Sequence, residues 1–311
     1  MQKTLIVAGA FGIATIGLGI ALPARAPGSS ITTQETSSRA VVLFVGDMLF
    51  DRHIRLMMDK HGGDYIFSCL NGLFENADLV VGNLEGPITN EPSVSVDLDL
   101  NSPNNFRFTF RPETAQLLAR HGIKVVSLGN NHISNFGLQG IDSTKNYLDE
   151  ANVGYFGGSS KEETIYRTEV NGVPLSLISY NEFGGVSTKV VAEVVAAERT
   201  VGRVPIVYAH WGDEYTEEPP RVRATAKLLA VAGASAIIGS HPHVVLSSEY
   251  ISAEKTLVYW SLGNFIFDQY WEPAVSHGLV VALTISPTEI LNVTEYQVEL
   301  LKDGRTCLLT K

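Results

Sequence analysis

The sequence of 311 residues is poor in cysteine and in positive charge. It contains only Cys69 and Cys307, and 23 lysines and arginines stand against 33 aspartates and glutamates, a formal net charge of −10. The two cysteines lack the clustered spacing of a thiolate zinc site. In an oxidising compartment they could pair, or both could be buried free thiols. An acidic chain offers no field to hold DNA or RNA, so nucleic acid is excluded as a partner.

Long apolar runs are scarce too, with one exception at the N-terminus. An uncharged apolar run extends from Thr4 to Leu22, and Ala24-Arg25-Ala26 has the small-x-small form of a cleavage site. We therefore expect residues 1–26 to be a secretory signal peptide or, because the run is just long enough to span a bilayer, an uncleaved membrane anchor. Either interpretation places the rest of the chain outside the cytoplasm, secreted or anchored. Residues 27–39, rich in Ser and Thr, are expected to be a linker.

Residues 40–311 are expected to form one α/β domain. Short β-branched apolar runs alternate with segments of helical periodicity, which is typical of a buried, largely parallel sheet. The predicted strands are Val41–Val45, Leu79–Val81, Lys124–Leu128, Val204–Ala209 and Ala234–Ile238. The predicted helices are Ile54–Lys60, Thr114–His121, Gly137–Ala151 and Arg221–Ala232. A hairpin is predicted around Asn171-Gly172, and a long loop or insertion over Asn90–Asn105.

The C-terminal part has a different pattern, with strand-like runs separated by short turns. These runs are Thr256–Trp260, Gly278–Ile285, Ile290–Glu299 and Thr306–Leu309. We expect them to be antiparallel and to form a second sheet. The whole predicts a four-layer α/β/β/α sandwich, in which two mixed sheets lie face to face and helices cover the outside.

Polar residues follow six of the predicted strands at the point where each strand ends. They are Asp47, Asn83 with Glu85, Asn130 to His132, His210, His241 with His243, and Asn264 with Asp268. In open α/β sheets, ligands bind beyond the carboxyl ends of the strands, so we expect these side chains to converge. Taken singly, Asp47 could cap a helix and each histidine could be structural. Four histidines converging with carboxylates indicate ligands for Zn, Mn or Fe.

Two of the histidines stand at positions 241 and 243. If that segment is extended, residues i and i+2 point to the same side, and both rings can face one site. With the carboxylates and Asn131, the inventory is large enough for two divalent metal ions, of the kind that lie ~3.5–4 Å apart and activate water.

Five segments resemble, in order, the motifs of calcineurin-like metallophosphoesterases. They are Gly46-Asp47, Gly82-Asn83-Leu84-Glu85-Gly86, Gly129-Asn130-Asn131-His132, His210, and Gly239-Ser240-His241-Pro242-His243. More specifically, the sequences GNLEGP, NNH, HWGxEY, HPHV and SLGNFIFDQ are similar to those of the capsule and poly-γ-glutamate biosynthesis (CapA/PgsA-type) family. The resemblance covers about Val41 to Tyr270.

This resemblance implies roles for individual residues. It makes Asp47, Asn131, His210, His241 and His243 metal ligands, and His132 the acid that protonates the leaving oxygen. We choose Glu85 as the bridging carboxylate, because Asn83 carries no charge to hold two cations, and Asn83 stays open as the alternative. Arg52 and Glu214 are expected to contact substrate. Asn83, Asn130, Asn264 and Asp268 are expected to support the ligands through hydrogen bonds.

The chain departs from the superfamily pattern at two places. The first motif is normally Asp-x-His, and here Leu49 stands where the histidine is expected. The second motif normally has Asp where this chain has Asn83, followed by Glu85. One metal position is therefore expected to be weakened, shifted or empty, and the fold is better supported than phosphatase activity.

The resemblance implies an exported, metal-dependent hydrolase in capsule or poly-γ-glutamate biosynthesis, acting on a phosphoester. Two alternatives stay open. One is a membrane-associated component of polymer assembly or export, with no phosphatase activity. The other is a hydrolase of the γ-glutamyl amide bond. The expected partners are an anionic polymer or a phosphoester, and membrane-bound capsule synthesis proteins.

Overall fold

The fold is known from a computed structural model that describes residues 1, 4–14, 17, 38–70, 72–96, 102–158, 160–251 and 255–309. The predicted cleavage site at residues 24–26 and almost all of the predicted linker lie outside these ranges. Residues 1–36 and 37–311 make up separate units. In the first unit, residues 4–14 contain no helix or strand. Nowhere in the described ranges does a helix combine the length and the apolarity of a membrane span.

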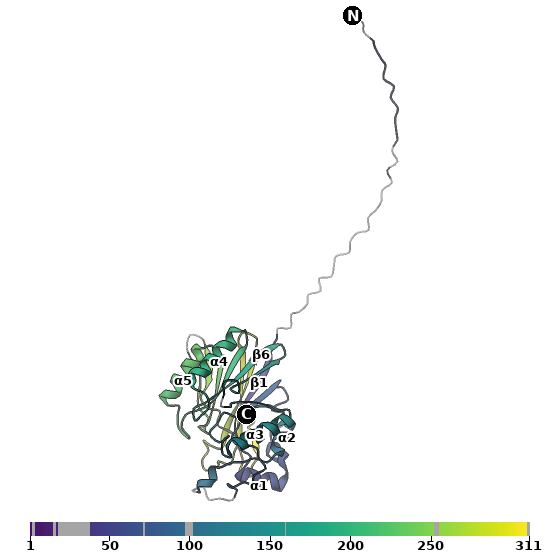
Figure 1. The fold of residues 1–311 in the computed structure, drawn as a ribbon. Coiled ribbons are helices and arrows are strands. Elements are labelled where there is room, and N and C mark those ends of the chain that lie inside the picture. The colour runs from purple at the N-terminus through teal and green to yellow at the C-terminus, as the bar shows by residue number, and fades with distance from the viewer. Residues whose placement is uncertain are drawn as a thin grey trace. The chain divides into compact units, whose positions relative to one another are not determined.

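Two mixed sheets form the centre of the second unit (Figure 1). The first has the order β14 (Thr306–Leu308), β13 (Ile290–Leu300), β12 (His277–Ile285), β1 (Ala40–Met48), β2 (Leu79–Leu84), β3 (Ile123–Ser127) and β4 (Gly154–Phe156), and β11 (Asn264–Ile266) also pairs with β1. The second has the order β5 (Ile165–Val170), β6 (Val173–Asn181), β7 (Val204–His210), β8 (Ala236–Ser240), β10 (Thr256–Tyr259) and β9 (Ser248–Ile251).

Strand alternation decides which residues lie between the sheets. On β7, Ile206 and Tyr208 belong to the core between the two sheets, whereas Val207 and Ala209 belong to the core under the outer helices. This is the two-residue period of a strand that is buried on both faces. Such a strand has little room for ionisable groups along its length, and β7 places its histidine, His210, at its carboxyl end.

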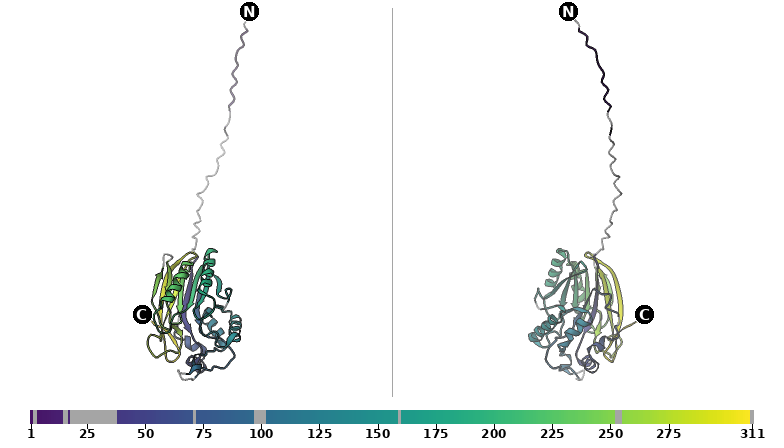
Figure 2. Two further views of the ribbon diagram at one scale, coloured as in Figure 1. Left: turned by 60° about the vertical axis from the view of Figure 1, so that its left-hand side comes forward. Right: turned by 90° about the vertical axis from the view of Figure 1, so that its right-hand side faces the viewer.

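Helices cover both outer faces, which completes four layers (Figures 1 and 2). The outer face of the first sheet packs against α1 (Arg52–His61), α2 (Glu113–Arg120) and α3 (Gly137–Glu150). The outer face of the second packs against α4 (Thr188–Thr200) and α5 (Pro220–Val231). Two short 3-10 helices, η1 (Gly63–Phe67) and η2 (Pro103–Phe106), lie in connections. The predicted α/β/β/α sandwich is confirmed.

The predicted division of strands between the sheets is wrong. The C-terminal strands β12, β13 and β14 extend the first sheet, because β12 pairs antiparallel with β1 from Ala40 to Phe44. The second sheet is built around β6, β7 and β8. The apolar run Pro174–Ser179, which follows the turn of the predicted hairpin, belongs to β6 inside the second sheet. It is buried because β6 pairs with β5 on one side and parallel with β7 on the other.

Local signals account for what the sequence analysis found and missed. The hairpin at Asn171-Gly172 is confirmed. Both residues have a positive φ, 50° at Asn171 and 78° at Gly172. A two-residue turn with these angles has a backbone twist that matches the twist of the two strands it joins. Helix α4 was missed, since it contains four valines, which favour strands. In the predicted loop Asn90–Asn105, η2 begins at Pro103, and residues 97–101 lie outside the described ranges.

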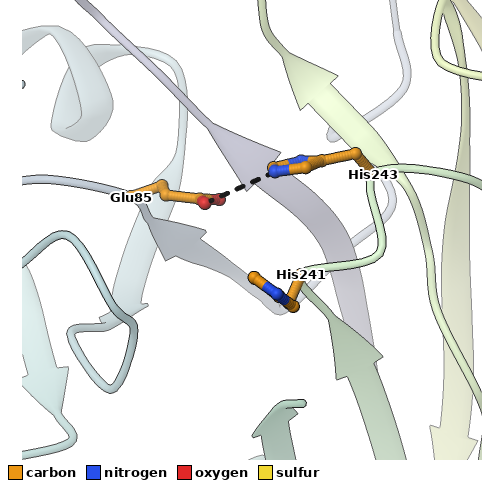
Figure 3. A group of neighbouring side chains, drawn as sticks. All are labelled: Glu85, His241 and His243. Carbon is orange, nitrogen blue, oxygen red and sulfur yellow. Dashed lines mark ion pairs between the residues drawn. The ribbon is translucent and has the colours of Figure 1, made fainter. Parts of the chain in front are cut away.

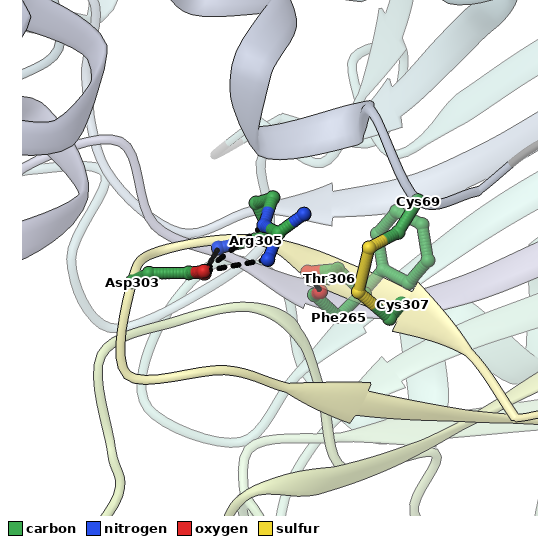
Figure 4. The surroundings of a disulfide bond; sticks show 6 residues. All are labelled: Cys69, Phe265, Asp303, Arg305, Thr306 and Cys307. Carbon is green, nitrogen blue, oxygen red and sulfur yellow. Dashed lines mark hydrogen bonds and ion pairs between the residues drawn. A yellow bond between two sulfur atoms is a disulfide. The ribbon is translucent and has the colours of Figure 1, made fainter. Parts of the chain in front are cut away.

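A disulfide joins Cys69 to Cys307, across 238 positions of the sequence (Figure 4). It settles the choice between pairing and free thiols. Cys69 follows η1, and Cys307 lies in β14 at the edge of the first sheet. Leu308 also donates a backbone hydrogen bond to the carbonyl of Cys69, at 3.3 Å. The bridge therefore fastens the edge of the first sheet to the segment that follows α1.

Removing this bridge is expected to destabilise the fold strongly, because it closes a long loop. The double variant Cys69→Ser/Cys307→Ser should lose about 2–5 kcal/mol of unfolding free energy, measured by urea denaturation. Reduction of the wild type should produce the same loss, and the variant should not respond to reductant. Equal stability of the oxidised, reduced and variant proteins would contradict the role given to the bridge.

A buried carboxylate in α4 holds the second sheet to its covering helix. Glu198, 4% exposed, accepts hydrogen bonds from Arg167 at 2.7 and 3.0 Å and from Ser176 at 2.8 Å. Arg167 and Ser176 lie on β5 and β6. Arg167 lowers the pKa of Glu198 below its ordinary value of 4.5.

We expect Glu198→Gln to lower the free energy of unfolding by about 2 kcal/mol at pH 7, since a hydrogen bond to a charged group contributes about 1.5–3 kcal/mol. A lowered folded pKa means that this contribution is complete above pH 4.5 and is lost as the pH falls through the folded value. Urea denaturation between pH 7 and pH 3 should show the difference shrinking in the acid range. Glu193→Gln, exposed on the same helix, is the matched control, and a loss as large there would contradict the assignment.

Candidate metal centre

The candidate site begins where inward-facing side chains of the two sheets meet. On β2, Asn83 is an even number of positions from Leu79 and Val81, so it lies on the same face of the strand. On β7, His210 shares a face with Ile206 and Tyr208 in the same way. All four apolar residues belong to the core between the sheets. Both polar residues are buried at the carboxyl ends of their strands. The Asn83 Nδ2 atom lies 3.5 Å from His210 Nδ1. Strand parity alone therefore brings the two sheets into polar contact at this edge.

Two carboxylates, Asp47 and Glu85, lie beside Asn83 and are fully buried. The Nδ2 group of Asn83 donates to Asp47 Oδ1 at 2.8 Å and to Glu85 Oε2 at 3.2 Å. Burial raises the pKa of Asp47 to about 6. Burial, followed by repulsion from Asp47, raises the pKa of Glu85 well above its ordinary value. The site thus confines two acidic groups where water does not stabilise their charge.

Three imidazoles complete what we call the central cluster. It consists of Asp47, Asn83, Glu85, His210, His241 and His243. Figure 3 shows Glu85 facing the two rings of His241 and His243, and Glu85 Oε1 lies 3.8 Å from His243 Nε2. His243 Nδ1 lies 3.5 Å from Asp47 Oδ2. Two triads have ligand atoms within 4.8 Å of one another: Glu85 with His241 and His243, and Asp47 with Glu85 and His210.

The histidines of the central cluster are held neutral. Burial lowers the pKa of His241 to about 4 and that of His243 to about 3, and it lowers the pKa of His210 well below its ordinary value. A neutral imidazole has a lone pair for a metal ion, and an imidazolium does not. The cluster therefore contains uncharged nitrogen donors beside carboxylates.

The backbone at His241 and His243 departs from the expected geometry. Their φ angles are 94° and 58°, and residues 241–244 form a bend. The extended segment that we expected is therefore wrong. Both rings face the cluster because two residues adopt a positive φ, which is costly outside glycine and recurs at active sites and ligand clamps. The backbone N–H of His241 donates to Asp47 Oδ2 at 3.1 Å, which supports the bend.

Neighbouring polar residues fix the ring orientations. His210 lies between Ser240 and Asn131, with its Nδ1 3.1 Å from Ser240 Oγ and its Nε2 2.8 Å from Asn131 Oδ1. His243 Nδ1 lies 2.9 Å from Asn264 Oδ1. Since an amide oxygen can only accept, this contact places the His243 proton on Nδ1 and leaves Nε2 toward Glu85. Such partners orient metal-binding histidines in known sites.

Asn130 has a structural place at the end of β3. Its Nδ2 donates to Asn83 Oδ1 at 3.0 Å and to the carbonyl of Leu84 at 2.8 Å. Its Oδ1 accepts from the backbone N–H groups of His132 and Ile133 at 3.0 and 2.9 Å. Asn130 therefore links β2 to the turn that carries Asn131 and His132.

His132 lies at the border of the central cluster. Its ring packs 4.4 Å from the ring of Phe108, and its Nδ1 lies 3.3 Å from Asn135 Oδ1. Burial lowers its pKa to about 4. The described residues show no hydrogen bond from His132 to a member of the cluster, so its role as the acid stays a prediction.

The guanidinium group of Arg52 is paired with the carboxylate of Asp268, so not all of its N–H groups are free to bind substrate. Its Nε donates to Asp268 Oδ2 at 3.1 Å, its Nη2 forms a short contact with Asp268 Oδ1, and the guanidinium lies over Phe108 and Phe267. Asp268 also accepts from the backbone of His53, at 3.1 Å. This pair holds the start of α1 to the segment after β11.

The loop after His210 brings Glu214 to the edge of the site. Glu214 is exposed, and its charge raises the pKa of both Asp47 and Glu85. Its neighbour Tyr215 is linked to the cluster through two other side chains. Gln269 Nε2 donates to Tyr215 Oη at 3.0 Å, and Gln269 Oε1 accepts from Asn264 Nδ2 at 2.9 Å. Since Asn264 also contacts the ring of His243, a chain of contacts runs from this loop into the cluster.

Several of these residues were missed by the sequence analysis. Ser240, Tyr215 and Gln269 lie inside segments whose family resemblance was recognised, so a signal was present. Asn135 lies three residues after His132, beyond the recognised motif. Phe183, whose ring lies 4.3 Å from that of His241, follows β6. It was missed because β6 was taken for a hairpin strand, so the residues beyond its carboxyl end were not considered.

The chemistry of the central cluster fits a divalent cation. Glu85 Oε1 and His241 Nδ1 are buried atoms that have no hydrogen-bond partner among the described residues. A buried polar atom without a partner is costly, and a cation would satisfy both. The mixed carboxylate and imidazole donors suit Zn, Mn or Fe. Where the first superfamily motif has histidine, Leu49 is buried in the core and supplies no ligand.

The fold of this chain also occurs among solved structures of other proteins. A solved structure of a hypothetical protein from Thermus thermophilus shares the fold, with a TM-score of 0.53 and 17% identity over 83% of this chain and 99% of that chain. A phosphatase from Mycoplasma pneumoniae aligns more weakly, with a TM-score of 0.49 and 13% identity over 85% of this chain and 94% of its own. That weaker likeness assigns no activity.

The sequence relatives are more specific. The profile of the family described as "Bacterial capsule synthesis protein PGA_cap" matches residues 41–269, more than half of the chain, and the chain belongs to this family. It is 28% identical to the capsule biosynthesis protein CapA of Bacillus anthracis over 85% of this chain and 68% of the relative. It is also 28% identical to the PGA biosynthesis protein CapA of Bacillus subtilis (strain 168), over 76% and 66%. The matched part is about two thirds of each relative's length.

The charge of the central cluster can be tested at Asn83. We expect Asn83→Asp, which adds a third carboxylate, to cost on the order of 3 kcal/mol of unfolding free energy in chelator-treated protein. The same variant should gain more than the wild type in melting temperature when Mn²⁺ is added, since a cation relieves the repulsion. Asn292→Asp, exposed on β13, is the control. A variant as stable as the wild type without metal would contradict the proposed electrostatics.

Proposed function

We propose that this protein is a metal-dependent hydrolase that acts outside the cytoplasm in capsule or poly-γ-glutamate biosynthesis, at a phosphoester. The proposal rests on the central cluster, in which Glu85 Oε1 and His241 Nδ1 are buried, without hydrogen-bond partners in the described chain, beside a second carboxylate. The role in capsule synthesis is supported by the family and by its CapA relatives.

The residues that would hold the cations are Asp47, Glu85, Asn131, His210, His241 and His243. When bound, divalent cations lower the pKa of water and stabilise the charge of a phosphoryl group. Glu85 belongs to both triads, so its carboxylate would be suited to lie between two cation positions. Asn83 orients both carboxylates through one amide group. Asn264 and Ser240 hold the rings of His243 and His210.

Proton transfer would fall to His132. Asn135 orients its ring, and Phe108 shields one face. With a pKa of about 4 it is neutral at pH 7, so its ring would have to take up a proton from water before it can protonate a leaving oxygen, and a bound anion would favour this by raising the pKa. An anionic substrate beside the ring would favour its protonated form.

Export is part of the same proposal. It is supported by the apolar run and cleavage pattern of the N-terminal segment. The disulfide between Cys69 and Cys307 adds support, because such bonds persist in oxidising compartments and are rare in the cytosol.

We expect the purified full-length chain, supplied with Mn²⁺ or Zn²⁺, to bind close to two metal ions and to hydrolyse a generic phosphodiester. His241→Ala should bind less metal and lose at least about 100-fold in turnover, because it removes a ligand that no neighbour replaces. Elemental analysis and release of the leaving group measure the two properties. His61→Ala, exposed at the end of α1, is the matched control.

Other outcomes would select the alternatives. Cleavage of poly-γ-glutamate but not of the phosphodiester would indicate a γ-glutamyl amide hydrolase. Metal content near zero, unchanged in His241→Ala and without turnover, would contradict the hydrolase and favour a component of polymer assembly.

A further inference from the structure

A pocket adjoins the central cluster between α3, the segments that follow β3 and β4, and the segment that follows β6. It has a volume of about 300 Å³ and shares Asn130 and Asn131 with the site described above. Phe183 forms part of its wall, and its ring lies 4.3 Å from that of His241 and 5.9 Å from that of His210. A ligand whose reacting group lay at the central cluster would place its neighbouring atoms in this pocket.

The lining combines apolar and uncharged polar groups. Leu128, Ile133 and Ile141 are apolar, and Phe183 exposes 46% of its surface. Asn131, Ser134 and Asn181 contribute amide and hydroxyl groups. Pockets of this kind bind ligands that present both an apolar face and groups that form hydrogen bonds.

Glycine keeps one wall of the pocket flat. Gly157 has a φ of 108°, and a Cβ placed there would lie 2.4 Å from the backbone nitrogen of Gly129. Glycine is therefore required, and the backbone of Gly157 and Gly158 forms this wall. Phe183 is the only aromatic ring among the described residues that line the pocket. A flat base is usually held by stacking on aromatic side chains, whereas a sugar ring needs one apolar platform and hydrogen-bonding groups around its edge.

Charge argues against a polyanion in this pocket. Its charged residues are Asp142, Lys145 and Glu163, and Lys145 is paired with Glu163. The loop between β7 and α5 carries Asp213, Glu214, Glu217 and Glu218, and Arg221 at the start of α5 is paired with Asp213 and Glu182. A chain of glutamate residues would place its carboxylates beside those of the protein. Among the described lining residues, no unpaired cation would offset the cost of removing the ligand's carboxylates from water.

We propose that this pocket is a subsite for an uncharged sugar ring attached to the reacting phosphate, so that the substrate class is a glycosyl phosphate rather than an anionic polypeptide. The inference rests on the proposed function, because it takes the central cluster as the site of the phosphate. Phe183 provides the apolar platform, and it is a specificity residue with no part in cation binding.

The test uses the full-length chain loaded with Mn²⁺ and titrated by calorimetry with phosphonates, which cannot be hydrolysed, and with poly-γ-glutamate. The probes are methylphosphonate, the phosphonate analogue of glucose 1-phosphate, a nucleoside phosphonate and poly-γ-glutamate. We expect the glucose phosphonate to bind at least about tenfold more tightly than methylphosphonate. In Phe183→Ala that ratio should fall to near one. In Trp271→Ala, which removes another exposed aromatic ring from beside Tyr215, the ratio should persist.

The outcomes separate this inference from the proposed function. Binding of methylphosphonate without any gain from the sugar ring would overturn the subsite and leave the hydrolase proposal intact. Tighter binding of the nucleoside phosphonate or of poly-γ-glutamate, lost in Phe183→Ala, would overturn the choice of a sugar. No binding of methylphosphonate or of Mn²⁺ would overturn the proposed function, and the inference with it. Thermal melts show whether each variant is folded.

Discussion

The burial of Asp47 and Glu85 side by side is the constraint on which the rest of the site depends. Both carboxylates are removed from water, and one amide group, that of Asn83, donates to both. The free energy of holding two acids in this environment is unfavourable without a positive charge. The surrounding structure maintains the arrangement nonetheless, through a bend with two non-glycine residues at positive φ and an amide that bridges the acids. Strain and buried charge concentrated at one sheet edge are typical of a functional site.

The two-sheet architecture makes that concentration possible. Parallel strands in both sheets deliver their carboxyl ends to the same edge, and strand parity turns Asn83, His210 and Ser240 toward the space between the sheets. Away from this edge, the same space is filled by apolar side chains. The polar cluster is therefore embedded in an apolar core, which explains why the histidines are neutral and why their partners are fixed. A single-sheet fold would leave one side of such a cluster open to water.

Much of the fold and of the site could be predicted from the sequence, for a physical reason. Strands buried on both faces are continuous apolar runs, and the polar residue that ends each run marks the site edge, as at Asp47 and His210. The assignment of strands to sheets could not be predicted, because β12 and β6 carry the same apolar pattern whichever neighbour they pair with. The bend at His241 was also beyond prediction, since it is supported by a hydrogen bond that its backbone N–H donates to Asp47, 194 positions away in the sequence. The role of Phe183 could not be predicted from apolar periodicity or motif spacing, because it depends on the position of its ring beside His241 in the folded chain.

The charges of the central cluster also bear on how two cations could be held. The three histidines are neutral, so Asp47 and Glu85 supply two negative charges, and Asn83 supplies none where the superfamily pattern has Asp. One divalent cation balances these two carboxylates. A second would leave two positive charges in a site enclosed by apolar side chains, which is as unfavourable as the two unbalanced acids. Under the proposed function, a phosphoester and the hydroxide that attacks it bring the missing negative charge. The second cation would then bind more tightly when the substrate is present than in the protein supplied with metal alone, and the absence of a carboxylate at position 83 would couple metal affinity to substrate binding.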